Sequence, residues 1–298
     1  MLLTQIDQEK TLPVLLAGLV FLLFGISSLQ GGYLRLFAAG LFLHLSMALS
    51  YDMVGGLLGY LHLGHGLFFG GGAYVAALAL QHNLGIVAAL VMGAVLMALA
   101  AVLLSLPLFR LGGAVFALAT LGLLFLGYHL AANVVSLTGG TAGLSLPPSA
   151  DTQKTFLAIT ALAALVVVGH WLVSTSSLGL KLSAVRESEE MAESIGINSG
   201  NIKKKALVLS AIPAAMAGCL HARLISFIVP SEVFSLEHSL APVIMCLLIK
   251  PGTTWGPFLG AVVLTCVQEL FWTTMPNFQS ALYGLLLIGL GVAQTRRR

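Results

Sequence analysis

Histidines provide the most suggestive spacing for chemistry in this sequence. His62 and His65 are three residues apart, which on a helix would place both imidazoles on one face, as in a pair of metal ligands. No third ligand lies near them, since Asp52 is ten residues earlier in the chain. We therefore expect this pair to be structural and predict no metal site.

Three further histidines and the three cysteines of the chain lie inside apolar runs. An imidazole in such a run is costly unless a neighbouring helix satisfies it, and it is often functional. A proton relay or an intramembrane enzyme built on these residues is therefore an alternative to a structural role for His44, His129 and His170. The odd number of cysteines and their wide spacing argue against disulfides or zinc, and predict small buried side chains at Cys219, Cys246 and Cys266.

Motifs for nucleotide hydrolysis and nucleophilic catalysis are missing from the sequence. A phosphate-binding P-loop ends in Gly-Lys-Ser or Gly-Lys-Thr, and this chain contains no Gly-Lys dipeptide. It also lacks a Gly-x-Ser-x-Gly elbow and a zincin motif. We predict a protein that is not an enzyme and has no cofactor of its own, with any ATP bound by a different chain.

A charged segment at residues 175–205 contains nine of the 25 charged residues of the chain. Within it, LSAVRESEEMAESI (182–195) predicts a short helix, on which Arg186 and Glu190 are four residues apart and share a face. Gly196 is placed to cap the end of this helix. Val185, Ala192 and Ile195 form a weakly apolar stripe on the opposite face. The segment is either a solvated loop with basic anchors at the membrane surface or a docking helix for a soluble partner.

The elements that surround this segment are predicted to be membrane-spanning helices. The 298 residues are 58% apolar and only 8% charged, whereas soluble domains carry about 25% charged residues. Strands are not expected, because an open sheet edge is not satisfied in lipid. About 20 apolar residues cross a bilayer, which predicts an all-α polytopic protein with ten spans, at 12–29, 33–51, 66–82, 84–108, 112–134, 155–174, 206–229, 238–250, 255–272 and 279–294.

Basic residues orient these spans. If segment 175–205 is cytoplasmic, ten crossings place both termini in the cytoplasm as well. Eleven basic residues then lie on the cytoplasmic side, and only Arg35, Lys154 and Arg223 lie on or near the other side. The predicted location is the inner (plasma) membrane, with the whole chain, 1–298, forming one transmembrane domain.

Several stretches of the sequence resemble one family of transport proteins. SYDMVGGLLGYLHLGHGLFFGGGAY (50–74), SLTGGTAGL (136–144), SSLGLKLSAVRESEEMAESIGIN (176–198) and WGPFLGA (255–261) are similar to segments of LivM-type permeases, which belong to the high-affinity branched-chain amino acid importers. The similarity covers most of residues 50–270. Urea and short-chain amide permeases share these motifs, so the resemblance defines the class of transporter better than the solute.

This resemblance implies an ATP-binding cassette (ABC) importer. Such a permease pairs with a homologous permease chain, two ATPase subunits and an extracytoplasmic solute-binding protein. Its signature of Glu-Ala-Ala, three residues and Gly is matched here by Glu190-Met191-Ala192 and Gly196, with Met191 in place of the middle Ala. The resemblance therefore implies ATPase coupling through Arg186, Glu187, Glu190, Ala192 and Gly196.

Glycine-broken segments are the predicted solute path, because transporters often bind substrate where interrupted helices meet. Segments 53–74 and 238–261 each contain Gly-x-Phe-x-Gly after a short apolar piece, which indicates either an internal repeat or tight helix packing. The candidate path residues are Gly64, His65, Gly66, Phe68, Gly70, Gly256, Phe258 and Gly260.

The solute is predicted to be neutral or zwitterionic, because charged side chains are nearly absent from the spans. Asp52 falls at the end of an expected helix, and Glu269 alone falls inside an expected span. A secondary transporter would more often carry intramembrane carboxylates for ion coupling. The function predicted is uptake of a small amino-acid-like solute, with a urea or amide permease and an ATP-independent transporter as alternatives.

Overall fold

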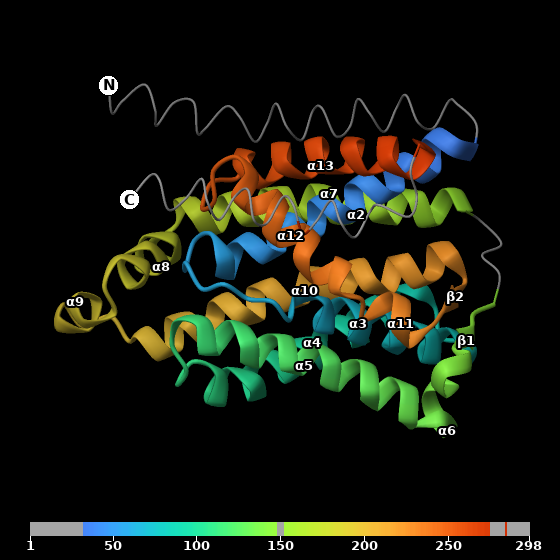
Figure 1. Cartoon of the computed structure of the whole chain (residues 1–298), viewed down its shortest axis with the longest axis horizontal. Helices are drawn as coiled ribbons and strands as arrows, with labels where there is room; N and C mark the ends of the chain where they lie inside the picture. The colour runs from blue at the N-terminus through green and yellow to red at the C-terminus, as the bar shows by residue number, and fades with distance from the viewer. Residues whose placement is uncertain (1–31, 148–151, 275–283, 285–298) are drawn as a thin grey trace.

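The computed structural model describes residues 32–147, 152–274 and 284, and nearly all of its regular structure is helical (Figure 1). The helices are α2 (Gly32–Gly55), α3 (His65–Gln81), α4 (Ile86–Leu108), α5 (Gly113–Asn133), α6 (Val135–Thr138), α7 (Thr152–Thr175), α8 (Ser177–Glu187), α9 (Glu189–Ser194), α10 (Ser199–Ile225), α11 (Pro230–Val233), α12 (Leu236–Leu248) and α13 (Trp255–Thr274), with a 3-10 turn at Gly140–Ala142.

Six stretches among the described residues are long and apolar enough to cross a membrane. They are α2, α4, α5, α7, α10 and the combined α11–α12 stretch Pro230–Leu248, and α13 adds a shorter apolar helix over Trp255–Phe271. The protein is therefore an all-α polytopic membrane protein. Eight of the predicted spans correspond to described helices. The other two, 12–29 and, apart from residue 284, 279–294, lie outside the described residues.

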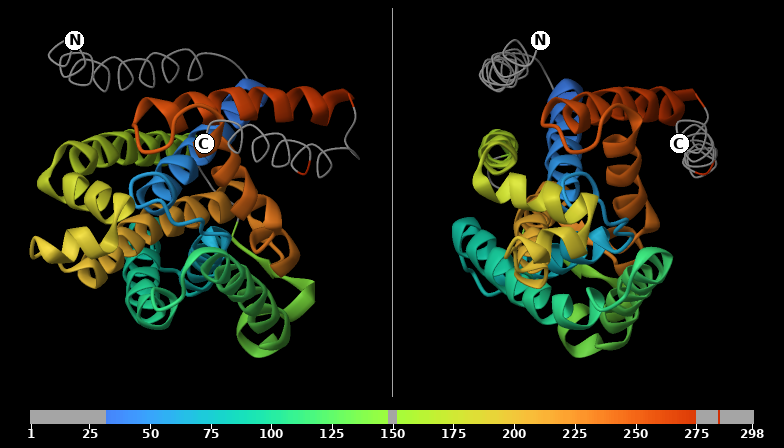
Figure 2. Two further views of the ribbon diagram at one scale, coloured as in Figure 1. Left: turned by 60° about the vertical axis from the view of Figure 1, so that its left-hand side comes forward. Right: turned by 90° about the vertical axis from the view of Figure 1, so that its left-hand side faces the viewer.

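Helix α10 is the central element of the bundle. Figure 2 shows it between α2 and α7 on one side and α4 and α5 on the other, and its most extensive contacts are with α3, α4 and α2. It begins seven residues before the predicted span 206–229, because the Asn198 side chain accepts a hydrogen bond from the Asn201 N–H at 2.9 Å and caps it. It ends at Ser226, whose left-handed backbone (φ +61°) stops the helix earlier than predicted.

Glycines let α3 and α10 cross at backbone contact. A Cβ atom on Gly218 would lie 1.9 Å from the carbonyl oxygen of Phe69, and one on Gly72 would lie 2.1 Å from that of Ala215. Small residues at such crossings allow the close packing that holds membrane helices together. These two glycines therefore set the distance between the central helix and α3.

The connection between α2 and α3 turns back into the bundle. Residues 56–64 lead from the end of α2 to the start of α3. His65, in the first turn of α3, has its Nε2 2.9 Å from Ser50 Oγ. Ser50 lies more than one turn before the end of α2, so the chain has come back alongside that helix. Helix α3 thus begins inside the protein rather than at its surface. This arrangement agrees with the glycine-broken pattern of segment 53–74.

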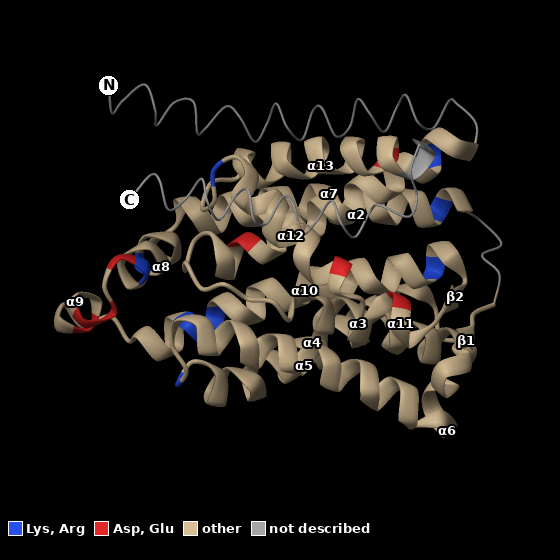
Figure 3. Cartoon of the chain, viewed as in Figure 1, with Lys and Arg blue, Asp and Glu red and all other residues tan. Residues whose placement is uncertain are grey.

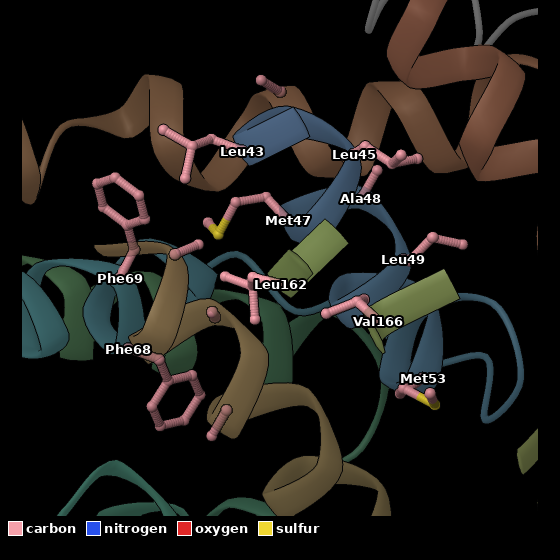
Figure 4. Close-up of a cluster of buried hydrophobic side chains, with 14 of the residues drawn as sticks. Leu43, Leu45, Met47, Ala48, Leu49, Met53, Phe68, Phe69, Leu162 and Val166 are labelled. Carbon is pink, nitrogen blue, oxygen red and sulfur yellow. The ribbon is translucent and has the colours of Figure 1, made fainter. Parts of the chain in front are cut away.

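The hydrophobic core surrounds α10 and includes buried side chains from most of the described helices. Figure 4 shows part of it, and the side chains that it labels, from α2, α3 and α7, are all buried. The labelled residues are Leu43, Leu45, Met47, Ala48, Leu49, Met53, Phe68, Phe69, Leu162 and Val166.

One short strand pair departs from the expectation of an entirely strand-free protein. β1 (Leu144–Ser145) and β2 (Phe227–Ile228) pair antiparallel, with Leu144 opposite Ile228. The pair lies at the end of the molecule away from α8 and α9 (Figure 1), where it joins the loop after α5 to the end of α10. A two-residue pair at a helix end leaves no long edge exposed to lipid, so the physical objection to strands does not apply to it.

Lysines and arginines lie mostly toward the two ends of the long axis, whereas several acidic residues lie between them (Figure 3). Helices α2 and α7 run toward the end that carries α8 and α9, whereas α10 runs away from it. The predicted minority of basic residues, Arg35, Lys154 and Arg223, therefore lies at the far ends of these three helices.

Candidate coupling and transport site

The charged loop forms two helices rather than the predicted single helix over 182–195. Helix α8 ends at Glu187 and α9 begins at Glu189, with an extended backbone at Ser188 between them (φ −159°, ψ 118°). The Ser188 side chain accepts a hydrogen bond from the Met191 N–H at 3.3 Å, which is an N-cap. The signal was present in the sequence as a serine followed by two acidic residues, the pattern of a helix start.

Gly196 caps α9 as predicted. Its φ of +84° is left-handed. The N–H groups of Gly196 and Ile197 donate to the carbonyls of Glu193 and Ala192, at 2.9 and 3.0 Å. This pair of bonds is a Schellman motif, which turns the chain sharply after a helix and favours glycine at this position.

Helix α9 presents an apolar surface away from the bundle. Met191 and Ile195 are four residues apart, and they are 68% and 73% exposed. Glu187 and Glu190 are exposed as well, whereas Ala192 is buried against the protein. The predicted apolar stripe of Val185, Ala192 and Ile195 does not form one face, because Ile195 follows the end of α9 and is exposed, and the break at Ser188 places Val185 on another helix. For the same reason Arg186 and Glu190 lie on different helices and share no helical face.

A charge pair with a buried lysine attaches α9 to the membrane bundle. Lys203, in the first turns of α10, is 3% exposed, and its Nζ donates to both carboxylate oxygens of Glu189 at 2.5 and 2.6 Å. The same ammonium lies 5.1 Å from the ring centre of Tyr60 and 5.9 Å from that of Phe109. Sequence reasoning did not single out Lys203, because it is the first of three consecutive lysines and only the fold distinguishes it.

The pKa of Glu189 responds to this setting. Partial burial favours the protonated acid, but the hydrogen bond and the positive charge of Lys203, together with a bond from Tyr60, outweigh it. The pKa of Glu189 therefore lies below its ordinary value of 4.5, and the carboxylate is charged at neutral pH.

The two halves of the loop hold the same piece of chain. Arg186 of α8 donates from Nη1 to the carbonyl of Gly56 at 2.7 Å, and Tyr60 Oη lies 3.5 Å from Glu189 of α9. Residues 56–60 follow directly after α2. A displacement of α8 and α9 would therefore pull on the α2–α3 connection.

The predicted path residues lie in the first turns of α3 and α13, on either side of α12. The Gly66 N–H donates to Ser239 Oγ of α12 at 2.9 Å. A Cβ on Gly70 would meet the Phe234 ring at 2.5 Å, and one on Gly260 would meet the Met245 carbonyl at 1.8 Å. In this conformation the glycines thus allow close packing. Gly64 lies in the same way against Thr120, and Gly256 against the Lys250 carbonyl. The remaining predicted path residues, His65, Phe68 and Phe258, are buried.

The histidines occupy separate places. His44 Nδ1 lies 3.0 Å from Thr265 Oγ1, whereas His129 is exposed on α5 and is not near His170. His62 and His65 have ring centres 6.0 Å apart. Within the described residues, no group of three His, Cys, Asp or Glu side chains is placed to hold a metal ion.

Asp52 lies in the last turn of α2, close to the predicted helix end, and it is completely buried. Its carboxylate is paired with His170, with Nε2 and Oδ2 2.8 Å apart. Sequence analysis gave no indication that these residues meet, because they are 118 positions apart.

The fold and this loop define a class, the polytopic α-helical membrane proteins with a charged helical loop at one end. Residues 34–291 match a family model described as "Branched-chain amino acid transport system / permease component". This match spans most of the chain, which therefore belongs to the family of branched-chain amino acid transport system permease components.

The named proteins that are similar to this chain are also permease proteins of transport systems. The chain is 30% identical over 281 residues to the high-affinity branched-chain amino acid transport system permease protein LivM of Salmonella typhimurium and to that of Escherichia coli. The alignment covers 83% of this chain, which spans 64% of the length of each LivM protein. It is 29% identical over 202 residues to the autoinducer 2 import system permease protein LsrC of Klebsiella pneumoniae, covering 59% of each chain. No solved structure matches the chain.

Proposed function

We propose that this protein is the membrane-spanning permease subunit of an ABC importer in the inner membrane, and that it is a transport subunit rather than an enzyme. Membership of the permease family supports this function. The proposal includes ten spans in one domain, with both termini and loop 175–205 in the cytoplasm. Its partners are a homologous second permease, two ATPase subunits and an extracytoplasmic solute-binding protein.

The observation that carries the proposal is the exposed apolar surface of α9. Met191 in α9 and Ile195 directly after it are exposed. Helix α9 lies at the end of the molecule, beyond the ends of α7 and α10 (Figure 1), where our proposal places the cytoplasm rather than lipid. Exposed apolar side chains rimmed by charge mark protein-binding sites. Glu187 and Glu190 supply that rim. The occupant is an ATPase subunit, because ATP has to be hydrolysed by a partner and this loop is attached to the bundle by Arg186 and by the Lys203–Glu189 pair.

The solute is a small amino-acid-like molecule, with branched-chain or other neutral amino acids as the first choice. The similarity to the two LivM proteins supports this choice. A urea or short-chain amide permease is the alternative. The solute passes along the glycine-rich starts of α3 and α13, at an interface with the second permease chain. The interrupted α3, which begins inside the protein, supports a path at this place.

The test is the recovery of ATPase subunits with the purified permease, together with ATP hydrolysis stimulated by the loaded binding protein. A double variant, Met191→Ser with Ile195→Ser, should lower recovery at least about tenfold, because anchors of an interface contribute about 2 kcal/mol or more when fully buried in it. Leu180→Ser is the matched control, since Leu180 is 73% exposed on the neighbouring helix α8. Undiminished recovery of the double variant would remove α9 from the docking site.

Charge at the rim is tested separately. Glu190→Lys should weaken docking by about 2–5 kcal/mol if Glu190 becomes buried against a basic partner group, and by much less if it stays at the rim. Solute uptake and stimulated ATP hydrolysis should fall together. If both activities keep their original levels in Glu190→Lys, Glu190 takes no part in coupling.

A further inference from the structure

A buried carboxylate in α2 joins four parts of the bundle. Asp52 Oδ1 accepts hydrogen bonds from Cys246 Sγ of α12 at 2.8 Å and from the N–H of Gly252, in the turn between α12 and α13, at 2.9 Å. Its Oδ2 accepts from His170 of α7. His170 also contacts the turn between α12 and α13 directly, because its Nδ1 lies 3.1 Å from Thr254 Oγ1. We call these five residues the Asp52 cluster.

Arg186 of the charged loop 175–205 touches this cluster at two glycines, Gly56 and Gly252, since a Cβ on Gly252 would lie 3.2 Å from Arg186 Nη1. Arg186 donates to the carbonyl of Gly56, four residues after Asp52. A Cβ on Gly56 would lie 1.8 Å from Asp52 Oδ1 and 2.4 Å from the Gly252 nitrogen, so the backbone at Gly56 lies directly against the carboxylate. Contacts therefore run without interruption from α8, through Gly56 and Asp52, to α7 and the α12–α13 turn.

Stability alone is a weak reason for such a cluster. Placing a carboxylate inside a membrane protein is costly even when it is paired, and apolar residues of similar size often stabilise a fold as well or better. A fully satisfied buried network does, however, hold its members in one arrangement. Elements held in this way move together, whereas elements in apolar contact can slide.

We propose that Asp52 and His170 are positioning residues of the transport cycle, which convert movement of α8 into movement of α7 and of the α12–α13 turn. This inference rests on the proposed docking of an ATPase on the loop that contains α8. The cluster binds neither solute nor nucleotide. It links the motor to the helices next to the proposed solute path, since α13, with Gly256 and Gly260, begins immediately after the turn.

The experiment compares solute uptake and ATP hydrolysis in the same proteoliposomes, which contain the complete importer and its loaded binding protein. His170→Leu removes both bonds of the imidazole and leaves an apolar side chain. We expect hydrolysis within about twofold of the unmodified importer and uptake at least tenfold lower, so that the number of ATP molecules hydrolysed per solute rises. His170→Gln, which can donate to Asp52 and accept from Thr254, should restore most of the uptake.

Two controls separate positioning from general loosening. His44→Leu removes a comparable His–Thr bond, to Thr265 between α2 and α13, and should leave the ratio of ATP to solute unchanged. Cys246→Val removes only one donor to Asp52 and should raise the ratio about two- to fivefold, whereas Cys246→Ser keeps a donor and should not. The cysteine variants decide the question if His170→Leu does not assemble.

An unchanged ratio in His170→Leu and Cys246→Val, or an equal rise in His44→Leu, would overturn the inference. Failure of the proposed function is a different observation, since the unmodified chain would then show no solute-dependent hydrolysis with ATPase subunits. In that case the positioning role is refuted as well.

Discussion

Single residues decide how the charged loop 175–205 is held. Glu189 and Lys203 form a pair in which the lysine is buried and the carboxylate is 42% exposed, and two aromatic rings cover the ammonium. Neighbouring Lys204 and Lys205 have the same charge but lack this carboxylate partner among the described interactions. Position within the fold, rather than residue type, thus distinguishes the three lysines.

Attachment of α9 should weaken at low pH. The pKa of Glu189 is lowered in the folded protein, so its contribution to stability is complete above its ordinary pKa of 4.5 and is lost as the pH falls through the lower folded value. Hydrogen exchange of the α9 amides should therefore be slow at pH 7 and accelerate, relative to its intrinsic rate, below about pH 4.5. Glu189→Gln should exchange quickly at both pH values. Equal protection of α9 in the variant at pH 7 would refute this role of the pair.

At the scale of elements, the shape of the loop depends on one backbone conformation. A Cβ on Gly196 would meet no atom within 4 Å, so Gly196→Ala introduces no clash and tests the left-handed backbone alone. We expect a cost of about 1–2 kcal/mol to the closed loop, because L-residues disfavour this region. Gly196→Asn should cost less. The measurement is protease cleavage after Lys203–Lys205, which should become faster in Gly196→Ala, and identical cleavage of all three proteins would contradict the expectation.

The close backbone contact between α3 and α10 can be tested by a substitution at Gly218. Gly218→Ala would place a methyl group 1.9 Å from the Phe69 carbonyl oxygen, which is backbone and has to move. Overpacking of this kind costs about 1–3 kcal/mol, so the thermal midpoint in detergent should fall. Gly122→Ala is the control, since a methyl group in α5 would meet no atom within 4 Å. If both variants have the same thermal midpoint as the unmodified protein, the backbones of α3 and α10 are not in contact.

At the scale of the whole molecule, the fold divides the basic residues between two ends. Arg186 and Lys203 belong to loop 175–205, and Lys250 lies close to it, because Arg186 reaches Gly56 and the turn after Lys250. At the other end of the molecule lie Arg35, in the first turn of α2, and Arg223, in the last turn of α10. The excess of positive charge is thus on the side of α8 and α9. Such an excess is typical of the cytoplasmic side.

Cysteine labelling in intact cells checks this orientation. In a chain with Cys266→Ser, the remaining Cys219 and Cys246 are buried. An impermeant thiol reagent should label Asn83→Cys, which is exposed at the corner between α3 and α4, and should leave Lys181→Cys on α8 unlabelled until the cells are opened. Labelling of position 181 in intact cells would reverse the topology.

The sequence by itself determined the helical class, the approximate position of every described span, the charged loop and the cap at Gly196. These properties depend on contiguous residues, because an apolar run of sufficient length crosses a membrane whatever its neighbours are, and a glycine after a helix ends it locally. Tertiary structure alone decided the surface formed by Met191 and Ile195 and the burial of Lys203. It also brought Asp52 to His170 and Cys246, which are 118 and 194 positions away. Such pairings depend on how helices pack in three dimensions, and packing leaves no periodic signal in the sequence from which they could be predicted.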